Sequence, residues 1–375
     1  MKAKVWKLLA VIITVIFALS TANAVHAVGV TAIITVGGNP IGVAYDSGKG
    51  EIFVVNSGNN SVSVISNNTN NAIANVTVGA GPHDLVYDSG KGEIYVANFG
   101  SDSVSVISDS TNTVVATVPV GTFPSSVAYD SGKNAIYVAD SGDGAVSVIS
   151  DSTNTVVTNV TVGVGPYDLA YDSGKGEIFV ANFLPDTVSV ISDSTNTVVA
   201  NVTVGESPLG VAYDSVKDEI FVANSGVGTV SVISDSTNTV VTNVTVGVAA
   251  DSYDLAYDSV KGEIYVSNFG ADSVSVISDS TNAVVATLSV GTEPFGIAYD
   301  RGKGQVFVAN YGSGTVSVIS DSLGPSPSPS PTVSVSSSPT VPEFSGAAFI
   351  LVVVAVVVVT FCGVALAIKK PKKST

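Results

Sequence analysis

The stretch VGVTAIITVGG, residues 28–38, decides the fold. Its β-branched residues alternate with smaller ones and glycines close it, which is typical of a β-strand. A strand needs a partner, and the nearest neighbours of this stretch in the sequence offer none of matching kind. Its partner must therefore lie elsewhere in the chain.

A repeat fills the middle of the chain. A Tyr-Asp pair occurs at the same place in each of seven repeats, from Tyr45-Asp46 to Tyr299-Asp300, at a constant spacing except for one slightly longer interval. In the second repeat, residues 84–87, 93–98, 103–108 and 114–120 have the alternation of strands, and Gly, Asn, Asp and Ser fill the links. Helical solenoids have similar periods, but no segment before residue 347 has helical spacing. Four antiparallel strands per repeat predict an all-β fold, a seven-bladed β-propeller.

The count of strands explains the opening stretch. Numbered in the order of each repeat, the second and third strands occur seven times. The fourth strand occurs only six times after the first repeat begins, because the chain after Ser320 becomes rich in Pro and Ser. Residues 31–38, TAIITVGG, align with the fourth-strand pattern TVVATVPVG. The N-terminal strand should therefore complete the last blade and close the ring, which removes exposed sheet edges.

These repeats resemble the YVTN-family β-propeller repeat. The resemblance rests on G-x-x-P-x-x-[VIL]-[AV]-Y-D, followed by [YF]-V-[AVS]-[ND] and S-V-I-S, and it covers residues 28–322. The single tryptophan, Trp6, precedes the repeats, so the Trp-Asp pair of WD40 blades is absent. The resemblance implies a cell-surface protein, because the family is seen in archaeal surface-layer proteins and bacterial envelope proteins.

The N-terminus has the features of a secretory signal peptide, assigned to residues 1–27. Lysines precede a charge-free run from Leu8 to Leu19, and small-residue cleavage sites follow it. The run is too short to span a bilayer comfortably, although an uncleaved N-terminal anchor is the alternative. We therefore expect the protein to be exported.

The C-terminal region is predicted to tether the propeller to a membrane. Residues 323–342 are rich in Pro and Ser and indicate an extended stalk. Within residues 343–375, the charge-free segment 347–368 is long enough for one transmembrane helix, and the lysines after it mark the cytoplasmic side. VPEFSG at 341–346 resembles the PEF-type sorting signals, which implies processing by an archaeosortase; a retained anchor is the alternative.

The charge of the exported part limits its partners. Between Gly38 and Gly346 the sequence has 31 acidic and eight basic residues, a net charge of −23. Nucleic-acid binding needs a basic footprint and is therefore not expected. The only cysteine, Cys362, lies in the predicted span, so the exported part has no disulfide.

The variable residues are expected on one face of the propeller. The turns of the other face repeat almost unchanged and indicate a scaffold. Each even-numbered blade has two aspartates at the same spacing with a phenylalanine between them: Asp84, Phe99 and Asp102; Asp168, Phe183 and Asp186; Asp254, Phe269 and Asp272. Such patches suit a hard cation such as Ca²⁺ or a stacked sugar, although two carboxylates are few for Ca²⁺. Inherited repeat sequence with surface charge is the alternative interpretation.

No catalytic residues are predicted. The exported part has one histidine, His83, and one arginine, Arg301, and neither has an evident catalytic partner. We predict a structural or adhesive binding module at the cell surface that requires no cofactor. Its partners would be the membrane and cell-surface glycans or envelope proteins. The alternative is a lactonase- or lyase-like envelope enzyme that uses the channel face.

Six Asn-x-Ser/Thr sequons are candidate glycosylation sites in an exported protein. They begin at Asn59, Asn67, Asn75, Asn159, Asn201 and Asn243. Four of them read Asn-Val-Thr in the fourth strand type, where the period of two places Asn and Thr on one face. Repeat duplication of polar strand-forming residues is the alternative explanation.

Overall fold

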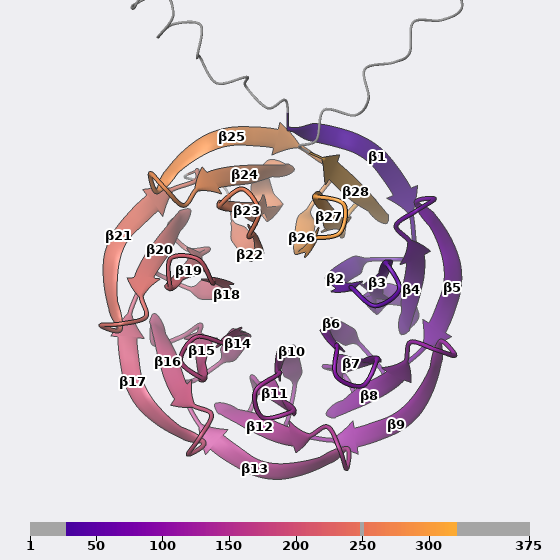
Figure 1. Cartoon of the computed structure of the whole chain (residues 1–375), viewed down its shortest axis with the longest axis horizontal. Coiled ribbons are helices and arrows are strands. Elements are labelled where there is room, and N and C mark those ends of the chain that lie inside the picture. The colour runs from indigo at the N-terminus through magenta and orange to yellow at the C-terminus, as the bar shows by residue number, and fades with distance from the viewer. Residues whose placement is uncertain (1–27, 248–250, 321–375) are drawn as a thin grey trace, which may run out of the picture. The chain divides into compact units, whose positions relative to one another are not determined.

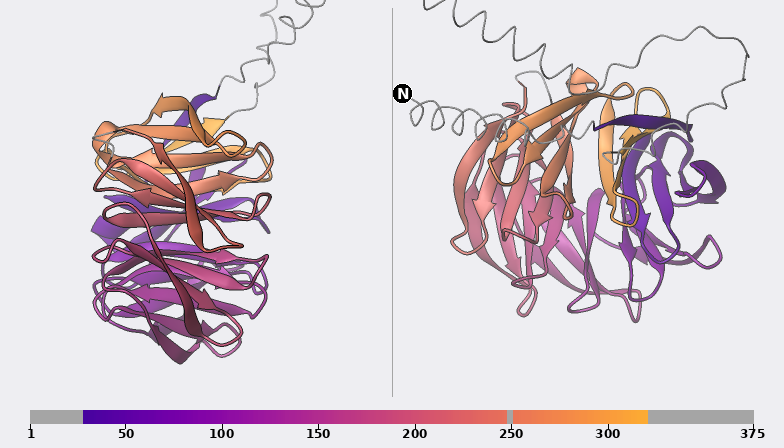
Figure 2. Two further views of the ribbon diagram at one scale, coloured as in Figure 1. Left: turned by 90° about the vertical axis from the view of Figure 1, so that its left-hand side faces the viewer. Right: turned by 45° about the horizontal axis from the view of Figure 1, so that its top comes forward.

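The computed structural model describes residues 28–247 and 251–320, which form a β-propeller of seven four-stranded antiparallel sheets (Figure 1). The predicted signal peptide, stalk, PEF-like motif, transmembrane span and basic tail lie outside the described residues. No helix in the described part is long and apolar enough to cross a membrane. Seen from the side, the blades form a short cylinder with turns at both ends (Figure 2).

Each sheet is a blade that runs from the central channel to the perimeter (Figure 1). The first strands of blades 1 to 7 line the channel: β2 (Pro40–Asp46), β6 (Pro82–Asp88), β10 (Pro124–Asp130), β14 (Pro166–Asp172), β18 (Pro208–Asp214), β22 (Ser252–Asp258) and β26 (Pro294–Asp300). The second strands follow outward: β3 (Glu51–Asn56), β7 (Glu93–Asn98), β11 (Ala135–Asp140), β15 (Glu177–Asn182), β19 (Glu219–Asn224), β23 (Glu263–Asn268) and β27 (Gln305–Asn310).

The third and fourth strands form the outer half of each blade. The third strands are β4 (Ser61–Ser66), β8 (Ser103–Ser108), β12 (Ala145–Ser150), β16 (Thr187–Ser192), β20 (Thr229–Ser234), β24 (Ser273–Ser278) and β28 (Thr315–Ser320). The fourth strands are β5 (Asn71–Thr77), β9 (Thr113–Pro119), β13 (Thr155–Thr161), β17 (Thr197–Thr203), β21 (Thr239–Thr245), β25 (Ala283–Ser289) and β1 (Gly29–Thr35). Two single-turn 3₁₀ helices, η1 (Ser57–Asn59) and η2 (Phe269–Ala271), join second to third strands.

Strand β1 completes the last blade. It pairs antiparallel with β28, from Gly29 opposite Ser320 to Thr35 opposite Thr315. The sheet order β1-β28-β27-β26 confirms the prediction that the N-terminal strand closes the ring. Blade 7 therefore contains both ends of the described chain (Figure 1).

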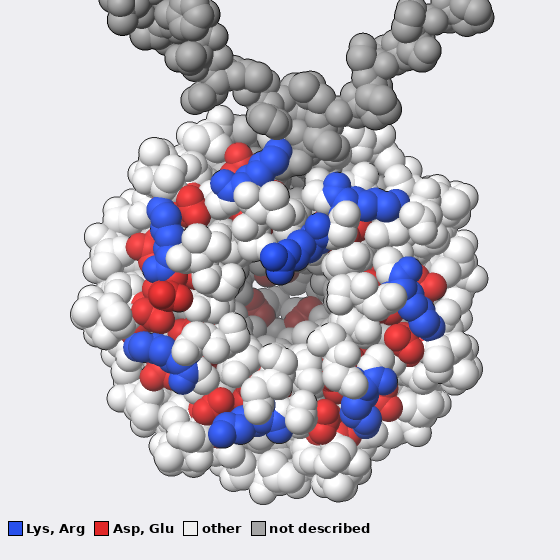
Figure 3. Space-filling model, viewed as in Figure 1, with Lys and Arg blue, Asp and Glu red and all other residues white. Residues whose placement is uncertain are grey.

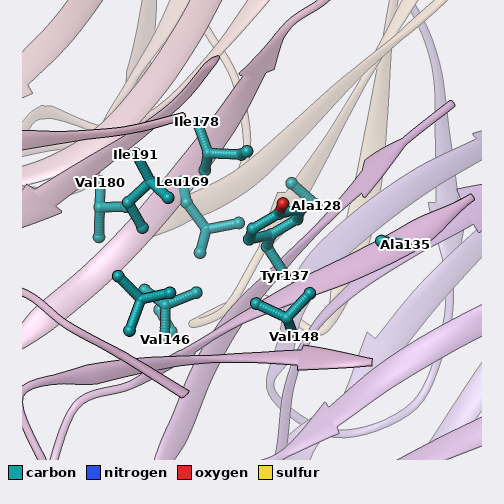
Figure 4. Close-up of a cluster of buried hydrophobic side chains, with 11 residues drawn as sticks. Ala128, Ala135, Tyr137, Val146, Val148, Leu169, Ile178, Val180 and Ile191 are labelled. Atoms are coloured by element: carbon teal, nitrogen blue, oxygen red, sulfur yellow. The ribbon is translucent and has the colours of Figure 1, made fainter. Parts of the chain in front are cut away.

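The hydrophobic core lies between neighbouring blades, where the second and third strands are almost fully buried. Between blades 3 and 4, Tyr137 and Val146 pack against Leu169, Ile178 and Val180 (Figure 4). Burial of such side chains stabilises the fold by about 1.5–3 kcal/mol each relative to exposure. Both faces of each blade are covered, so this interface is repeated around the ring.

The repeated Tyr-Asp pair holds neighbouring blades together on the face that carries the turns between first and second strands, which we call the turn face. Asp88 accepts hydrogen bonds from the backbone N–H groups of Gly90 and Lys91 at 2.8 and 3.2 Å, which fixes the turn after β6. Burial, together with a hydrogen bond to Asp88, raises the pKa of Tyr129 in the next blade to about 12. Lysine and acidic side chains lie beside one another around this face (Figure 3). The hydrogen bonds of this face thus fix each turn and link neighbouring blades.

Candidate functional site

A cavity of about 130 Å³ lies where the first strands enter the channel. It is lined mainly by the second and third residues of these strands, among them His83 and Asp84 of β6 and Tyr253 and Asp254 of β22. A register irregularity at the start of each first strand, as between Pro82 and Asp84, interrupts the alternation. Because a bulge re-aims side chains, two consecutive residues can reach the channel.

Three half-buried aspartates of the even-numbered blades form the acidic wall of the cavity: Asp84, Asp168 and Asp254. Each carboxylate also accepts a backbone hydrogen bond from the first strand of the next blade. The donors and distances are Val127 to Asp84 at 3.2 Å, Val211 to Asp168 at 2.7 Å and Ile297 to Asp254 at 3.0 Å. The aspartates therefore join each even blade to the odd blade that follows.

Small residues in the odd blades let the first strand of the blade that follows each of them approach closely. The third position of the first strand is Gly42, Ser126, Gly210 and Gly296 in blades 1, 3, 5 and 7. A Cβ atom on Gly210 would lie 2.4 Å from the carbonyl oxygen of Tyr253. The small residue at this position is thus required by packing against the backbone of the next blade.

Burial raises the pKa of all three aspartates. The pKa of Asp168 rises to about 7, first through burial and then through the charge of Asp84. Burial and the charges of both other aspartates hold the pKa of Asp254 well above its usual range. The three carboxyl groups therefore titrate as one set.

An aromatic cluster covers the same end of the channel; we call it the aromatic mouth. Nine ring contacts, with centroids 4.3–6.5 Å apart, connect its members: His83, Phe99, Phe123, Tyr167, Tyr253, Phe269, Phe295 and Tyr311. Four of these rings also line the cavity, those of His83, Tyr167, Tyr253 and Phe295. The mouth therefore continues the cavity wall out to the surface.

Phe123 is the least expected member of the mouth. Its backbone has φ 54°, in the left-handed region that disfavours bulky residues, and its side chain is 49% exposed. Its ring stacks on Phe99 with the centroids 5.0 Å apart. The corresponding residue is Gly81 in the preceding blade and Gly165 in the next, and the other four blades have smaller or polar residues there, also at positive φ: Asn39, Ser207, Asp251 and Glu293. Backbone strain that carries an exposed aromatic ring points to a role outside the fold.

The predicted pairs of aspartates do not form three separate patches. Only Asp84, Asp168 and Asp254 line the cavity. Their predicted partners cap loops of the next blade instead: Asp102 accepts from the N–H of Phe123, Asp186 from that of Ser207 and Asp272 from that of Glu293, at 2.8–2.9 Å. Within residues 28–247 and 251–320, no three His, Cys, Asp or Glu side chains are arranged to hold a metal ion. The Ca²⁺ hypothesis stays a prediction.

His83 and Arg301 lie in different places. His83 is within 2.7 Å of the Ser125 carbonyl oxygen through Nδ1 and 3.3 Å of the Tyr167 hydroxyl through Nε2. Burial lowers the pKa of His83, so it is neutral at neutral pH. Arg301 is exposed in the turn after β26, at the opposite end of that strand from Phe295.

The structure separates the six predicted glycan sites. Asn75, Asn159, Asn201 and Asn243 are exposed on fourth strands, and Asn59 is exposed in η1. Asn67 is only 6% exposed, and its Nδ2 donates to Asp300 at 2.7 Å. Because this nitrogen would carry the glycan, modification of Asn67 would cost the folded protein this hydrogen bond, and the prediction for this site stays untested.

Sequence reasoning missed the aromatic mouth and Ser126, whose hydroxyl lies within hydrogen-bond distance of both Asp84 and Asp168. The sequence does contain a signal for both, because the second and third residues of the first strands differ between blades while the surrounding repeat stays constant. Aligned by repeat, the variable positions include His83, Tyr167 and Phe295. Their convergence depends on ring closure and on the bulges, which no single repeat reveals.

Comparison with known proteins supports the fold and no family. No family model matches the sequence, and no curated protein matches it. Among solved structures, the chain is similar to Kuenenia stuttgartiensis Hydrazine Synthase, with a TM-score of 0.69 and 19% identity over 77% of this chain and 97% of that chain. A likeness at this identity concerns the propeller fold alone. The YVTN family, the archaeal origin and the PEF signal stay predictions.

Proposed function

We propose that this protein is a non-catalytic binding module, exported and tethered at the cell surface, whose ligand enters at the aromatic mouth. The observation that carries the proposal is the difference between the two faces. One face repeats a charged turn in each blade, whereas the other gathers eight connected rings from different blades. Exposed aromatic clusters mark binding surfaces, since monomeric proteins rarely leave them uncovered.

The expected partner is an envelope component, either a glycan or a protein. Phe99 and Phe123 of the mouth are 37% and 49% exposed, so their rings are available to stack on a sugar or to pack on a partner. The YVTN-like repeats and the predicted anchor support this setting, in which the chain serves a structural or adhesive role in a surface layer. A predicted stalk at residues 323–342 would hold the mouth away from the membrane.

Capture by envelopes tests the proposal. Labelled full-length protein is applied to envelopes of its native cells, as wild type, as Phe99→Ala/Phe269→Ala and as Val216→Ala/Val260→Ala. The control pair removes two apolar side chains that are 66% and 67% exposed on the turn face. We expect the mouth variant to lose capture and the control to retain it. Equal capture by all three proteins would overturn the proposal.

A second candidate function is an envelope enzyme that uses the same cavity. The observation in its favour is Asp168, because a carboxyl group with a pKa of about 7 suits general acid–base catalysis near neutral pH. Turnover of a panel of lactones, abolished in Asp168→Asn, would favour this candidate over a binding module.

A further inference from the structure

The channel cavity has the size and the walls of a site for a small organic group. Its volume of about 130 Å³ is close to the roughly 150 Å³ of a protein cavity that holds benzene. The rings of His83, Tyr167, Tyr253 and Phe295 form a closed circuit in its wall. Neighbouring centroids around the circuit are 5.5, 6.5, 4.3 and 5.6 Å apart. This part of the lining is therefore aromatic.

The cavity lining is also acidic, and no cation among the described lining residues balances it. The titratable side chains that line it are Asp84 and His83 of β6, Tyr167 and Asp168 of β14, and Tyr253 and Asp254 of β22. The lining residues from β2, β10, β18 and β26 are not titratable, and no lysine or arginine is among the described lining residues. A charge removed from water without a partner is costly, so the carboxylates favour a proton or a bound cation.

We propose that this cavity binds an alkylated ammonium group, held between the four aromatic rings and the carboxylates of Asp84, Asp168 and Asp254. The proposal rests on the proposed function, since it names the chemistry of a ligand that enters at the aromatic mouth. Aromatic faces attract a cation within about 6 Å of the ring centroid, and a carboxylate supplies the opposite charge. Quaternary ammonium ions are recognised by aromatic cages in this way.

The cavity is less suited to Ca²⁺. That ion takes 6–8 oxygen ligands at about 2.3–2.6 Å. Here Asp254 accepts backbone N–H groups with both carboxylate oxygens, from Leu255 at 2.7 Å and Ile297 at 3.0 Å. Viewed from the lysine-bearing face, acidic atoms lie deep in the central hollow (Figure 3).

Calorimetric titration of the full-length protein with choline tests the proposal. The matched probe is 3,3-dimethylbutan-1-ol, which has the shape of choline without its charge. We expect choline to bind at least about tenfold more tightly than the neutral probe near pH 8, and more weakly near pH 5, where the carboxyl groups take up protons. Equal binding of the two probes, or no choline binding near pH 8, would overturn the proposal.

Variants locate the site. Asp254→Asn and Tyr253→Leu should each weaken choline binding by about tenfold or more. Asp272→Asn is the matched control, because Asp272 lies in the same blade but caps a loop and does not line the cavity. Unchanged binding in both cavity variants would place choline elsewhere and overturn the proposal. Calcium binding that excludes choline would assign the cavity to a metal ion and would also overturn the proposal.

The two proposals fail separately. Envelope capture that depends on Phe99 and Phe269, without choline binding, would leave the binding module intact and remove the ammonium site. Choline binding without envelope capture would leave the site and remove the adhesive role.

Discussion

The hydroxyl oxygen of Ser126 lies 2.6 Å from a carboxylate oxygen of Asp84 and 2.6 Å from one of Asp168. Distances this short are those of O–H···O⁻ hydrogen bonds, but a serine hydroxyl has one proton to donate. The second contact therefore needs a proton on one of the two carboxyl groups. The raised pKa of Asp168, about 7, agrees with this geometry. Ser126 thus holds two aspartates that share one negative charge.

The first prediction is that Asp168→Asn stabilises the protein at high pH. A folded-state pKa of about 7 is above the unfolded value of about 3.9, so the stability that Asp168 contributes is present below about pH 4 and is lost as pH rises toward 7. Asparagine can replace the protonated acid, because its amide donates to Ser126 while its oxygen accepts from Val211. Since water reaches the channel, we expect a gain of only about 1–2 kcal/mol near pH 8.

Thermal unfolding of the wild type and Asp168→Asn between about pH 4 and pH 8 measures this gain. Asp186→Asn is the control, since it changes the same charge outside the cavity. A difference between wild type and Asp168→Asn that does not grow with pH would contradict the shared proton.

Asp140→Asn should also stabilise the protein near pH 8. The other six blades have asparagine here, and in blade 2 Asn98 Nδ2 donates to Ser105 at 3.0 Å. In blade 3, Ser147 must instead donate to Asp140, and burial raises the pKa of Asp140 to about 6. We expect a gain of about 1–2 kcal/mol, which shrinks as pH falls below about 6. Denaturant unfolding at two pH values measures it; a loss of stability near pH 8 would contradict it.

Ring closure was predictable from the sequence because it depends on counting strands. The pairing of β1 with β28 follows from one missing fourth strand, and the strand pattern needs no tertiary information. The cavity was less predictable, because Asp84 and Asp168 lie two repeats apart in the chain and meet only through Ser126. The spacing shared by the even-numbered blades suggested instead that Asp84 and Asp102 form one site. In the structure, a bulge turns Asp84 into the channel, whereas Asp102 caps a loop.

Phe123→Gly should separate stability from function. Glycine adopts a φ of 54° without strain, so we expect the variant to be about 1 kcal/mol more stable. The same change removes a ring that is 49% exposed and stacks on Phe99, so envelope capture should fall. Chemical denaturation and the capture assay measure the two effects. A variant that is less stable, or that captures envelopes as well as wild type, would show that Phe123 serves the fold alone.

Gly296→Ala should weaken the contact between blades 7 and 1. A Cβ atom at Gly296 would lie 2.1 Å from the carbonyl oxygen of Ile41, so one backbone segment must move. We expect a loss of about 1–3 kcal/mol in the free energy of unfolding, as for other overpacked positions. Gly29→Ala is the control, because a Cβ atom there meets nothing within 4 Å. Equal stability of the two variants would mean that the ring accommodates a methyl group at this joint.

The exposed sequons on fourth strands should carry glycans in the native envelope, whereas Asn67 should not. In Asn201 and Asn243, a serine of the neighbouring strand donates to the side-chain oxygen at 2.8 Å, so this bond does not occupy the nitrogen that carries a glycan. In Asn67 that nitrogen is buried against Asp300. Mass spectrometry of glycopeptides from native envelopes gives the occupancy of each site. A glycan on Asn67 would show that modification precedes folding of blade 1, and six unmodified sites would end the hypothesis that this propeller is glycosylated.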